Sequence, residues 1–570
     1  MKPLDWAVLA GTLLLIVGYG AWKTRRVTTA DAWLRGGNDL KWWTIGLSIM
    51  ATQASAITFL SMPGQAYEDG LGFVQFYFGL PVAMVILSAT IVPIYHRLKV
   101  YTAYEYLETR FDLKTRQLTA FLFLLQRGLA AGISIYAPAI ILSTVLGWSL
   151  QWTNLVIGVV VILYTVSGGT RAVAQTQTWQ MVVMLGGMAL AFVFILRGLP
   201  AGMTVGHAVD VAGAFGKVNI VDFSPRLDTR YTFWSGMTGG LFVALAYFGT
   251  DQSQVQRYLS GSPLVESRLG MLFNGLVKVP MQLFILMVGL MVFVFYQYNP
   301  PPLFWNEPEL ARVRETPQAA ELKQLEAAWA ERLGERRALL DAWEAERLSG
   351  DEGRIDAAKD ALRAGESRAK KLREEARALI KRARPKAETK DADYIFIGFV
   401  RRHFPEGLVG LLIAVILCAA MSATASALNA LGSTTVVDFY KRSVRPDASD
   451  AHYLRAAQLF TVFWGVVAML FAAFASLLDN LIQAVNILGS IFYGPTLGVF
   501  LVGFFFKRIG ANPIFWALVI GQAIVVAVFA LSSIGFLWYN VIGCASVVAI
   551  AAALSLYFRG ANPSSLIKNA

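Results

Sequence analysis

The stretch from Cys418 to Asn429 places small and hydroxyl-bearing residues inside an otherwise apolar run. Ser422, Ser426 and Asn429 are spaced i, i+4 and i+7, so a helix would carry them on one face. The alanines between them let a neighbouring backbone come close, and hydroxyl groups are neutral oxygen ligands suited to a dehydrated hard cation. Membrane helices also use small residues simply to pack closely. The stretch therefore has two interpretations, cation binding and helix packing.

A second apolar stretch, residues 49–65, is also polar near its middle. Its polar residues are Thr52, Gln53, Ser55, Thr58 and Ser61, and Pro63-Gly64 follows them. Backbone at membrane depth leaves the helix only where it lines protein or a water-filled cavity. Unwound carbonyl groups at that depth commonly bind the coupling cation of a transporter. The alternative is a packing face rich in Ser and Thr.

These two stretches belong to a chain with the composition of a polytopic membrane protein. Its 570 residues are 56% hydrophobic and 15% charged, and the mean hydropathy is +0.52. Each apolar run of roughly 20 residues is long enough for a hydrocarbon core of about 30 Å. We predict thirteen spans, at approximately 4–22, 42–67, 71–96, 118–147, 152–168, 176–198, 231–256, 267–298, 406–438, 452–477, 480–506, 513–532 and 535–558.

The distribution of Lys and Arg predicts the orientation of these spans. Basic residues gather in the loops after spans one, three, five, seven, nine and eleven. Loops rich in Lys and Arg stay on the cytoplasmic side, so we expect the N-terminus outside and the C-terminus inside. The net charge of +12 is then a sign of topology, and we expect no nucleic-acid partner. We expect the protein to lie in the lipid bilayer of a cell membrane, either a plasma membrane or a bacterial inner membrane.

Residues 300–393 interrupt the apolar pattern, with equal numbers of basic and acidic side chains, 20 of each. Two apolar stripes with helical spacing flank Ser349-Gly350-Asp351, which predicts an antiparallel helical hairpin on the outer side. Two tryptophans, Trp329 and Trp343, lie on the first stripe. The hairpin has three interpretations: a docking arm for an outer-side partner, a cap over the outer vestibule, or a solvated insertion.

Several motifs, in order along the chain, resemble sodium/solute symporters. They are Trp42-Trp43 before the polar mid-span and residues 104–111, 164–173, 251–258 and 421–440. Residues 135–139 and 230–234 are most similar to the branch that carries iodide, vitamins and monocarboxylates. The resemblance covers nearly all of the chain except 300–393.

The resemblance implies an all-α fold with ten core helices in two inverted five-helix repeats. We therefore divide the chain into a leading transmembrane helix with an inner loop (1–41), the first repeat (42–198), the start of the second repeat (199–299), the hairpin insertion (300–393), the rest of the second repeat (394–506), and two trailing transmembrane helices with an inner tail (507–570).

The resemblance also implies a sodium site between the first and eighth core helices. By position its ligands are the carbonyl groups of Ala51, Ala54 and Ala419, the hydroxyl of Ser422 and a second hydroxyl at position 423, with Ser426 nearby. Position 423 is an alanine here. Some members hold a second sodium ion with an aspartate on the fifth core helix, where this chain has Gln177, while the hydroxyls of Ser422 and Ser426 remain as sodium ligands. Both differences remove an oxygen ligand.

A substrate cavity is implied between the same helices. By position its lining is Gln53, Thr58, Tyr77, Tyr247, Phe248, Lys278 and Asn486. A lysine about eleven residues into a span is costly unless paired or wetted, so Lys278 predicts a contact to a polar or anionic substrate. The alternative is a structural pair with a buried acid. We interpret Arg127 as an interfacial anchor or inner-gate residue, and Asp251 with Arg257 as structural.

The function predicted from these features is secondary active transport by alternating access. The expected coupling ion is sodium, and the expected cargo is a small polar or anionic solute such as a sugar, an organic anion or a vitamin-like molecule. The sequence shows no catalytic triad, phosphate loop or metal-binding cluster, so we expect no enzyme. Two alternatives stay open: a sodium-independent or proton-coupled carrier, and a substrate sensor that no longer couples.

Overall fold

The computed structural model describes residues 2–24, 40–261, 263–385, 387, 389, 391–474 and 481–560, and these ranges are helical without a strand. The first half comprises α1 (Pro3–Thr24), α3 (Trp42–Gln53), α4 (Ala56–Asp69), η1 (Gly70–Tyr77), α5 (Leu80–Ala89), α6 (Ile91–Leu98), α7 (Glu105–Arg110), α8 (Leu113–Leu146), α9 (Leu150–Arg197) and α10 (Val205–Ala214). The second half comprises η2 (Ser235–Gly239), α11 (Gly240–Thr250), α12 (Gln252–Tyr258), α13 (Leu264–Tyr298), α14 (Glu307–Val313), α15 (Ala319–Ser349), α16 (Glu352–Ala383), η3 (Ala392–Tyr394), α17 (Ile395–His403), α18 (Leu408–Thr434), η4 (Thr435–Val444), α19 (Asp450–Ala472), α20 (Leu481–Phe505), α21 (Ala511–Leu531) and α22 (Leu537–Gly560).

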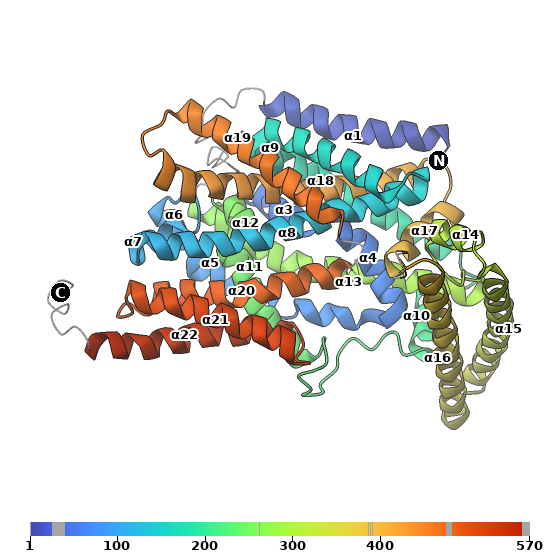
Figure 1. Ribbon diagram of the computed structural model, residues 1–570. Helices are drawn as coiled ribbons and strands as arrows, with labels where there is room; N and C mark the ends of the chain where they lie inside the picture. The colour runs from blue at the N-terminus through green and yellow to red at the C-terminus, as the bar shows by residue number, and fades with distance from the viewer. Residues whose placement is uncertain are drawn as a thin grey trace.

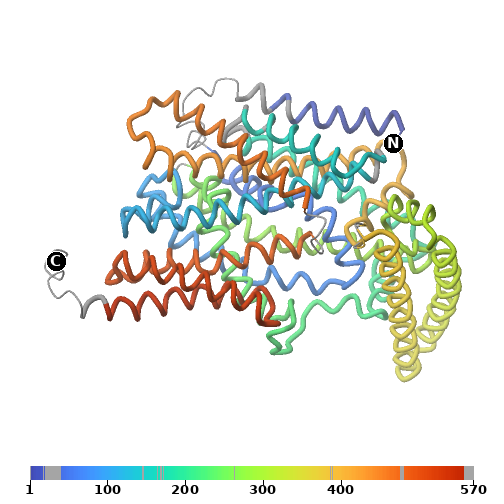
Figure 2. Tube along the Cα trace, in the orientation of Figure 1, coloured from blue at the N-terminus to red at the C-terminus, as the bar shows by residue number. Residues whose placement is uncertain are grey.

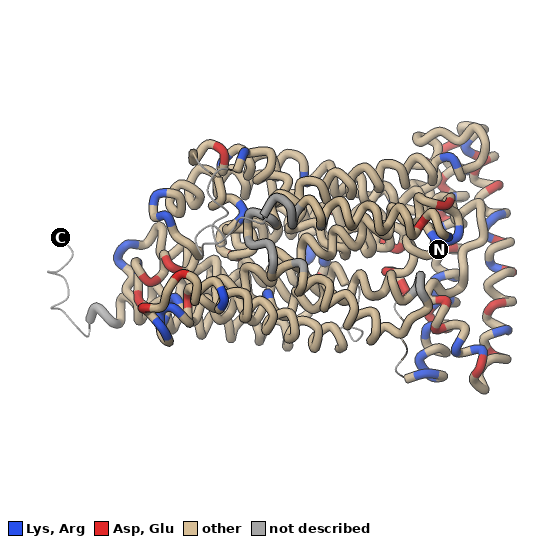
Figure 3. Tube along the Cα trace, turned by 90° about the horizontal axis from the view of Figure 1, so that it is seen from above, with Lys and Arg blue, Asp and Glu red and all other residues tan. Residues whose placement is uncertain are grey.

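The helices run roughly side by side, and charged residues gather at the two ends of the bundle (Figure 3). Within the described residues, nine helical stretches are long and apolar enough to cross a membrane, and two shorter apolar helices accompany them. The predicted spans 152–168 and 176–198 form one continuous helix, α9. A middle with few charges between charged ends is the pattern of a bundle that spans a bilayer. The number of membrane spans, thirteen, stays a prediction.

Two helices are broken near the middle of the bundle. The first break lies between α3 and α4, where Ala54 and Ser55 leave helical geometry, with ψ angles of 78° and 173°. Pro63 lies further on, inside α4. The second lies between α11 and α12 at Asp251, whose ψ angle is 117°. Breaks of this kind at corresponding places in two halves mark the binding region of many transporters.

Close backbone approaches hold α4 against its neighbours. A Cβ atom added to Gly289 of α13 would lie 2.2 Å from the carbonyl oxygen of Pro63, and one added to Gly64 would lie 2.1 Å from that of Ala392. Only glycine permits helices to come so near. Helix α18, which carries the hydroxyl-rich stretch, is almost wholly buried in the bundle (Figure 1). The first half-helix pair and α18 therefore form the centre of the molecule.

Helices α15 and α16 form an antiparallel hairpin at one end of the bundle (Figure 2). The N-terminal end of α1 lies at this same end, and α22 finishes at the opposite end (Figure 1). Trp329 and Trp343 are buried, and the Trp329 indole donates to the carbonyl of Pro301. The two side chains that suggested an external partner thus pack internally, and such a partner stays a prediction.

Candidate functional site

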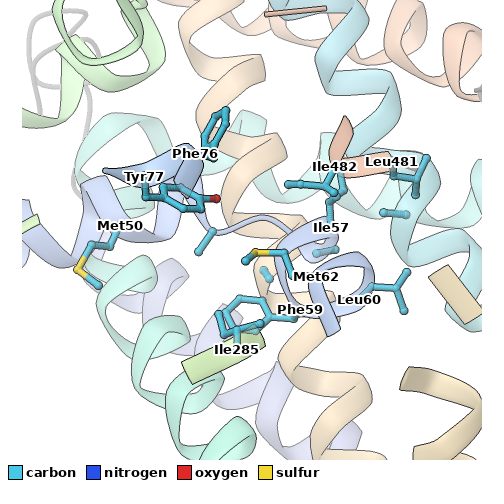
Figure 4. Packing of buried hydrophobic residues seen from close by; sticks show 14 of the residues in the cluster. Met50, Ile57, Phe59, Leu60, Met62, Phe76, Tyr77, Ile285, Leu481 and Ile482 are labelled. Atoms are coloured by element: carbon cyan, nitrogen blue, oxygen red, sulfur yellow. The ribbon is translucent and has the colours of Figure 1, made fainter. Parts of the chain in front are cut away.

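A cavity of about 100 Å³ lies beside the first break. Its walls come from the end of α3, the start of α4, and from η1, α5, α8, α11 and α20. Ile57 of α4 lies next to Ile482 of α20, and Phe76 and Tyr77 of η1 lie nearby (Figure 4). Residues far apart in the sequence thus meet at mid-bundle around one partly enclosed space.

Six of the seven residues predicted to bind substrate line this cavity. They are Gln53, Thr58, Tyr77, Tyr247, Phe248 and Asn486. Lys278 does not line it, although Gln282, one turn further along α13, donates to the Tyr77 hydroxyl at 2.6 Å. The Lys278 side chain is fully buried and its Nζ has no hydrogen-bond partner among the described residues. The structure therefore places Lys278 outside the cavity lining, one helical turn from a residue that contacts the lining.

Arg127 is the charged side chain of the cavity lining, and sequence analysis gave it a different role. Its guanidinium pairs with Asp251 at the second helix break, and its Nη2 also donates to the Tyr493 hydroxyl. Asp251 thus pairs with Arg127, and the expected structural pair with Arg257 does not form. Arg257 donates instead to backbone and amide oxygens. An arginine well inside the apolar helix α8 was the available signal for Arg127.

Three polar side chains around this cavity have atoms with no hydrogen-bond partner in the described parts of the chain. They are the Arg127 Nε, the Asn486 Nδ2 and the Gln53 Oε1. Buried polar atoms are rarely left unpaired, and an unpaired group in a cavity indicates a missing ligand or water. Two of the three atoms are donors, which suits a ligand rich in acceptor oxygens or an anion.

Two of the predicted cation ligands, Ser422 and Ala51, meet beside the first break. The Ser422 hydroxyl of α18 donates to the Ala51 carbonyl oxygen of α3 at 3.1 Å. Ala54, Ala419 and Ser426 are fully buried, whereas Ala423 is 9% exposed. A hydroxyl oxygen and helix-end carbonyl oxygens in a buried place are the ligand types that a sodium-sized cation requires. The set fits a cation, with one hydroxyl fewer than the resemblance implied.

Gln177 of α9 joins three helices next to these residues. Its Nε2 lies 3.1 Å from Thr52 Oγ1, 2.8 Å from Ser426 Oγ and 3.3 Å from the Ser422 carbonyl oxygen. Its Oε1 accepts from the Ser48 hydroxyl at 2.5 Å. Three oxygen atoms from α3 and α18 therefore converge on one amide nitrogen. Within the described residues, no group of three or more His, Cys, Asp or Glu side chains could hold a metal ion.

A helical bundle with two helices broken around a polar cavity at mid-bundle is the architecture of a secondary transporter. The comparison with protein families gives the same class. The model of the sodium:solute symporter family matches residues 33–314 and 377–521, and the chain belongs to that family. The match leaves out 315–376, which is most of the hairpin.

Curated relatives include three sodium-coupled transporters. The human sodium/iodide cotransporter is 34% identical over 303 residues, which cover 51% of this chain and 45% of that protein. The mouse sodium-coupled monocarboxylate transporter 1 is 27% identical, over 89% of this chain and 70% of that protein. The sodium/sialic acid symporter of Proteus mirabilis is 26% identical, over 94% and 91%.

Two solved structures show the same fold. A sodium-coupled sialic acid symporter in a substrate-bound outward-open state has a TM-score of 0.77 at 24% identity, covering 98% of each chain. A nucleobase-cation-symport-1 family transporter in a closed conformation has a TM-score of 0.50 at 11% identity, covering 93% of this chain and 95% of that one. At these identities the likeness concerns the fold and leaves the cargo open.

Proposed function

We propose that this protein is a sodium-coupled symporter of a small organic or inorganic anion. The observation that carries the anion is Arg127, a cation in the cavity wall whose Nε has no partner among the described residues. The neighbouring Asn486 amide adds a second unpaired donor. Charge-assisted bonds from arginine to an anion are short and about twice as strong as neutral ones.

The coupling ion proposed is sodium, held between α3 and α18. Ala51, Ala54 and Ala419 would supply carbonyl oxygens and Ser422 a hydroxyl oxygen. A cation there would join the first break to α18, and the cavity begins at the same break, with Gln53 and Ser55. Binding of sodium would therefore order the wall of the anion site before the anion arrives. That the relatives are sodium-coupled supports this choice of ion.

The transport cycle proposed is alternating access by two inverted five-helix repeats. Residues 42–198 would form the first repeat, and residues 199–299 with 394–506 the second. The breaks at Ala54-Ser55 and at Asp251 support this division, since they fall in the first predicted membrane span of each half. Tyr247 and Phe248 would close the cavity on one side. The ring of Tyr247 lies 5.8 Å from that of Tyr493, so the two are close enough to form a gate.

Uptake by purified protein in sealed vesicles tests the proposal. We would compare labelled iodide, a short monocarboxylate, sialic acid and a neutral sugar, each with an inward sodium gradient, a proton gradient or no gradient. Accumulation of an anion with sodium alone is expected. Equal uptake with a proton gradient or none would instead identify a proton-coupled or uncoupled carrier, and binding without uptake would identify a sensor.

The Arg127→Gln variant tests the anion site directly. Loss of the charge should raise the anion concentration for half-maximal uptake at least tenfold, about 1.4 kcal/mol. Arg127→Lys keeps a positive charge that can still face Asp251, so it should retain part of the affinity and controls for loss of the structural pair. Uptake of an anion unchanged in Arg127→Gln would contradict this assignment.

A further inference from the structure

The hairpin contacts the half-helix that forms one wall of the cavity. Arg377 of α16 pairs with Glu68 in the last turn of α4 at 2.9 Å, and Arg373 lies 3.9 Å from the same carboxylate. Lys370 donates to the Glu68 carbonyl oxygen at 3.3 Å. Three basic residues of α16 thus hold the end of α4 that points away from the break.

The same two arginines also pair with a buried aspartate, Asp391. Arg373 and Arg377 pair with Asp391 at 2.9 Å and 2.7 Å, and Asp391 is fully buried next to η3. Burial alone would raise the pKa of Asp391, but the two guanidinium groups outweigh it and keep the pKa below its ordinary value. The carboxylate therefore stays charged at neutral pH, and it anchors the arginines between α4 and η3.

Movement of α4 would change the cavity, because the helix carries Thr58 at its start and Glu68 at its end. Thr58 lines the cavity. Ten residues of helix separate it from Glu68, about 15 Å at 1.5 Å per residue. One turn before Glu68, Gln65 accepts a hydrogen bond from Gln483 of α20 at 3.1 Å, which joins the two walls. Opening the cavity toward the hairpin requires α4 and α20 to separate.

We infer that the hairpin is a clamp that holds α4 in the position that closes the cavity on the hairpin side, with Arg373 and Arg377 as its positioning residues. The inference rests on the proposed function, since it names the gate of the same cavity. The family model leaves out residues 315–376, which include Arg373, and its match resumes at Arg377. Opening must break the pairs with Glu68, while the pairs with Asp391 keep the hairpin in place.

The test measures access to the cavity without transport. A cysteine at Val485, which lines the cavity on α20, is treated with an impermeant thiol reagent from the hairpin side. The native Cys418 and Cys544 are both buried, so background labelling is low. Glu68→Gln in this background should raise the labelling rate about fivefold, as expected for the loss of one partly buried ion pair.

The matched control is Asp210→Asn, because Asp210 of α10 pairs with Arg347 of the hairpin at 3.0 Å and does not touch α4. It should leave the labelling rate and the melting temperature unchanged. Arg373→Gln combined with Arg377→Gln is a second variant that should also raise the rate. Equal rates in Glu68→Gln and the parent, or an equal rise in Asp210→Asn, would overturn the clamp. Labelling needs neither sodium nor substrate, so failure of the proposed function would leave this result interpretable.

Discussion

Ser422 is the residue on which the proposed cation site depends most. It is the one hydroxyl that remains of the pair expected at positions 422 and 423, and it donates to the Ala51 carbonyl oxygen of α3. Ser422→Ala should raise the sodium concentration for half-maximal uptake about fivefold, the value of one neutral hydrogen-bonding contact of ~1 kcal/mol. Sodium titration of uptake measures this shift.

Two further variants control the Ser422 result. Ala423→Ser restores an oxygen at the position that lacks one, and it should lower the sodium requirement by a similar factor. Ser433→Ala removes another buried hydroxyl of α18, one that donates within its own helix to the Asn429 carbonyl oxygen. Sodium dependence that is the same in Ser422→Ala and Ser433→Ala would remove Ser422 from the cation site.

Gln177 places an amide donor where three oxygen atoms converge, and a carboxylate there would change what those oxygens can bind. Gln177→Glu keeps the length of the side chain and replaces the donating nitrogen with an acceptor. The oxygens of Thr52, Ser422 and Ser426 would then face an anion, and a cation between them would relieve the repulsion. We expect sodium to raise the melting temperature of this variant more than that of the unmodified protein, because ligand binding stabilises the folded state.

Gln180 provides the control for Gln177, since it lies about one turn further along α9. It is fully buried, and neither amide atom has a partner among the described residues. Gln180→Glu should lose stability without gaining a response to sodium, because no comparable set of oxygens surrounds it. A sodium response of equal size in both variants would show that the effect is general to buried charge.

For single residues, the sequence predicts where a polar side chain lies along a helix, but the packing of the helices decides which cavity that side chain meets. Gln53, Thr58 and Asn486 could be predicted because the family resemblance places these positions in the cavity lining, and polar groups inside an apolar span need a partner. Lys278 was predicted on the same grounds, yet it does not line the cavity, whereas Gln282 on the same face of α13 contacts the lining residue Tyr77. Arg127 is also a polar residue inside an apolar span, but its role depends on Asp251, which lies 124 residues away in the chain. Pairings at that separation follow from packing and leave no local pattern.

At the scale of elements, the half-helices α3 and α4 matter because their break exposes backbone groups to both proposed ligands. Sequence indicated this break through its polar middle residues. The break at Asp251 was not predicted, since the sequence predicts one continuous span over residues 231–256. Asp251 accepts from the Ser253 backbone N–H at 2.9 Å, so it begins α12 as a capping residue while its other oxygen meets Arg127. One aspartate thereby serves the helix break and the cavity.

The packing of α4 on α13 gives a prediction about this element. Gly289→Ala would place a methyl group 2.2 Å from the Pro63 carbonyl oxygen, and backbone cannot yield as a flexible side chain does. Overpacking of this kind costs about 1–3 kcal/mol and would displace α4. We expect a lower melting temperature and slower uptake.

Gly186→Ala of α9 serves as the comparison for Gly289. A Cβ atom there meets nothing within 4 Å. Alanine in a helix interior is favoured over glycine by roughly 0.5–1 kcal/mol, so this variant should be as stable as the parent or more so. Full stability and uptake in Gly289→Ala would mean that α4 can shift away from α13 without effect on the cavity.

For the molecule as a whole, the gathering of most charged residues at the two ends agrees with a bundle that spans a membrane (Figure 3). Composition predicted this class, and the order of motifs predicted the family. Sequence alone left the hairpin with three interpretations because balanced charge and two apolar stripes suit all of them. The interpretation of the hairpin as a clamp depends on its ion pairs with Glu68 and Asp391, which lie outside the two hairpin helices.

Orientation in the membrane is the last prediction, and it follows from the loops rich in Lys and Arg. The hairpin should face outward and the loop around Asp447 inward, because basic loops are retained on the cytoplasmic side. Cysteines introduced at Ser349, the exposed tip of the hairpin, and at Asp447 distinguish the two sides. An impermeant thiol reagent applied to intact cells should label Ser349→Cys at once and Asp447→Cys only after the membrane is opened. Since both native cysteines are buried, the unmodified protein is the blank. The reverse pattern would invert the bundle, and the clamp on α4 would then control the gate that faces the cytoplasm.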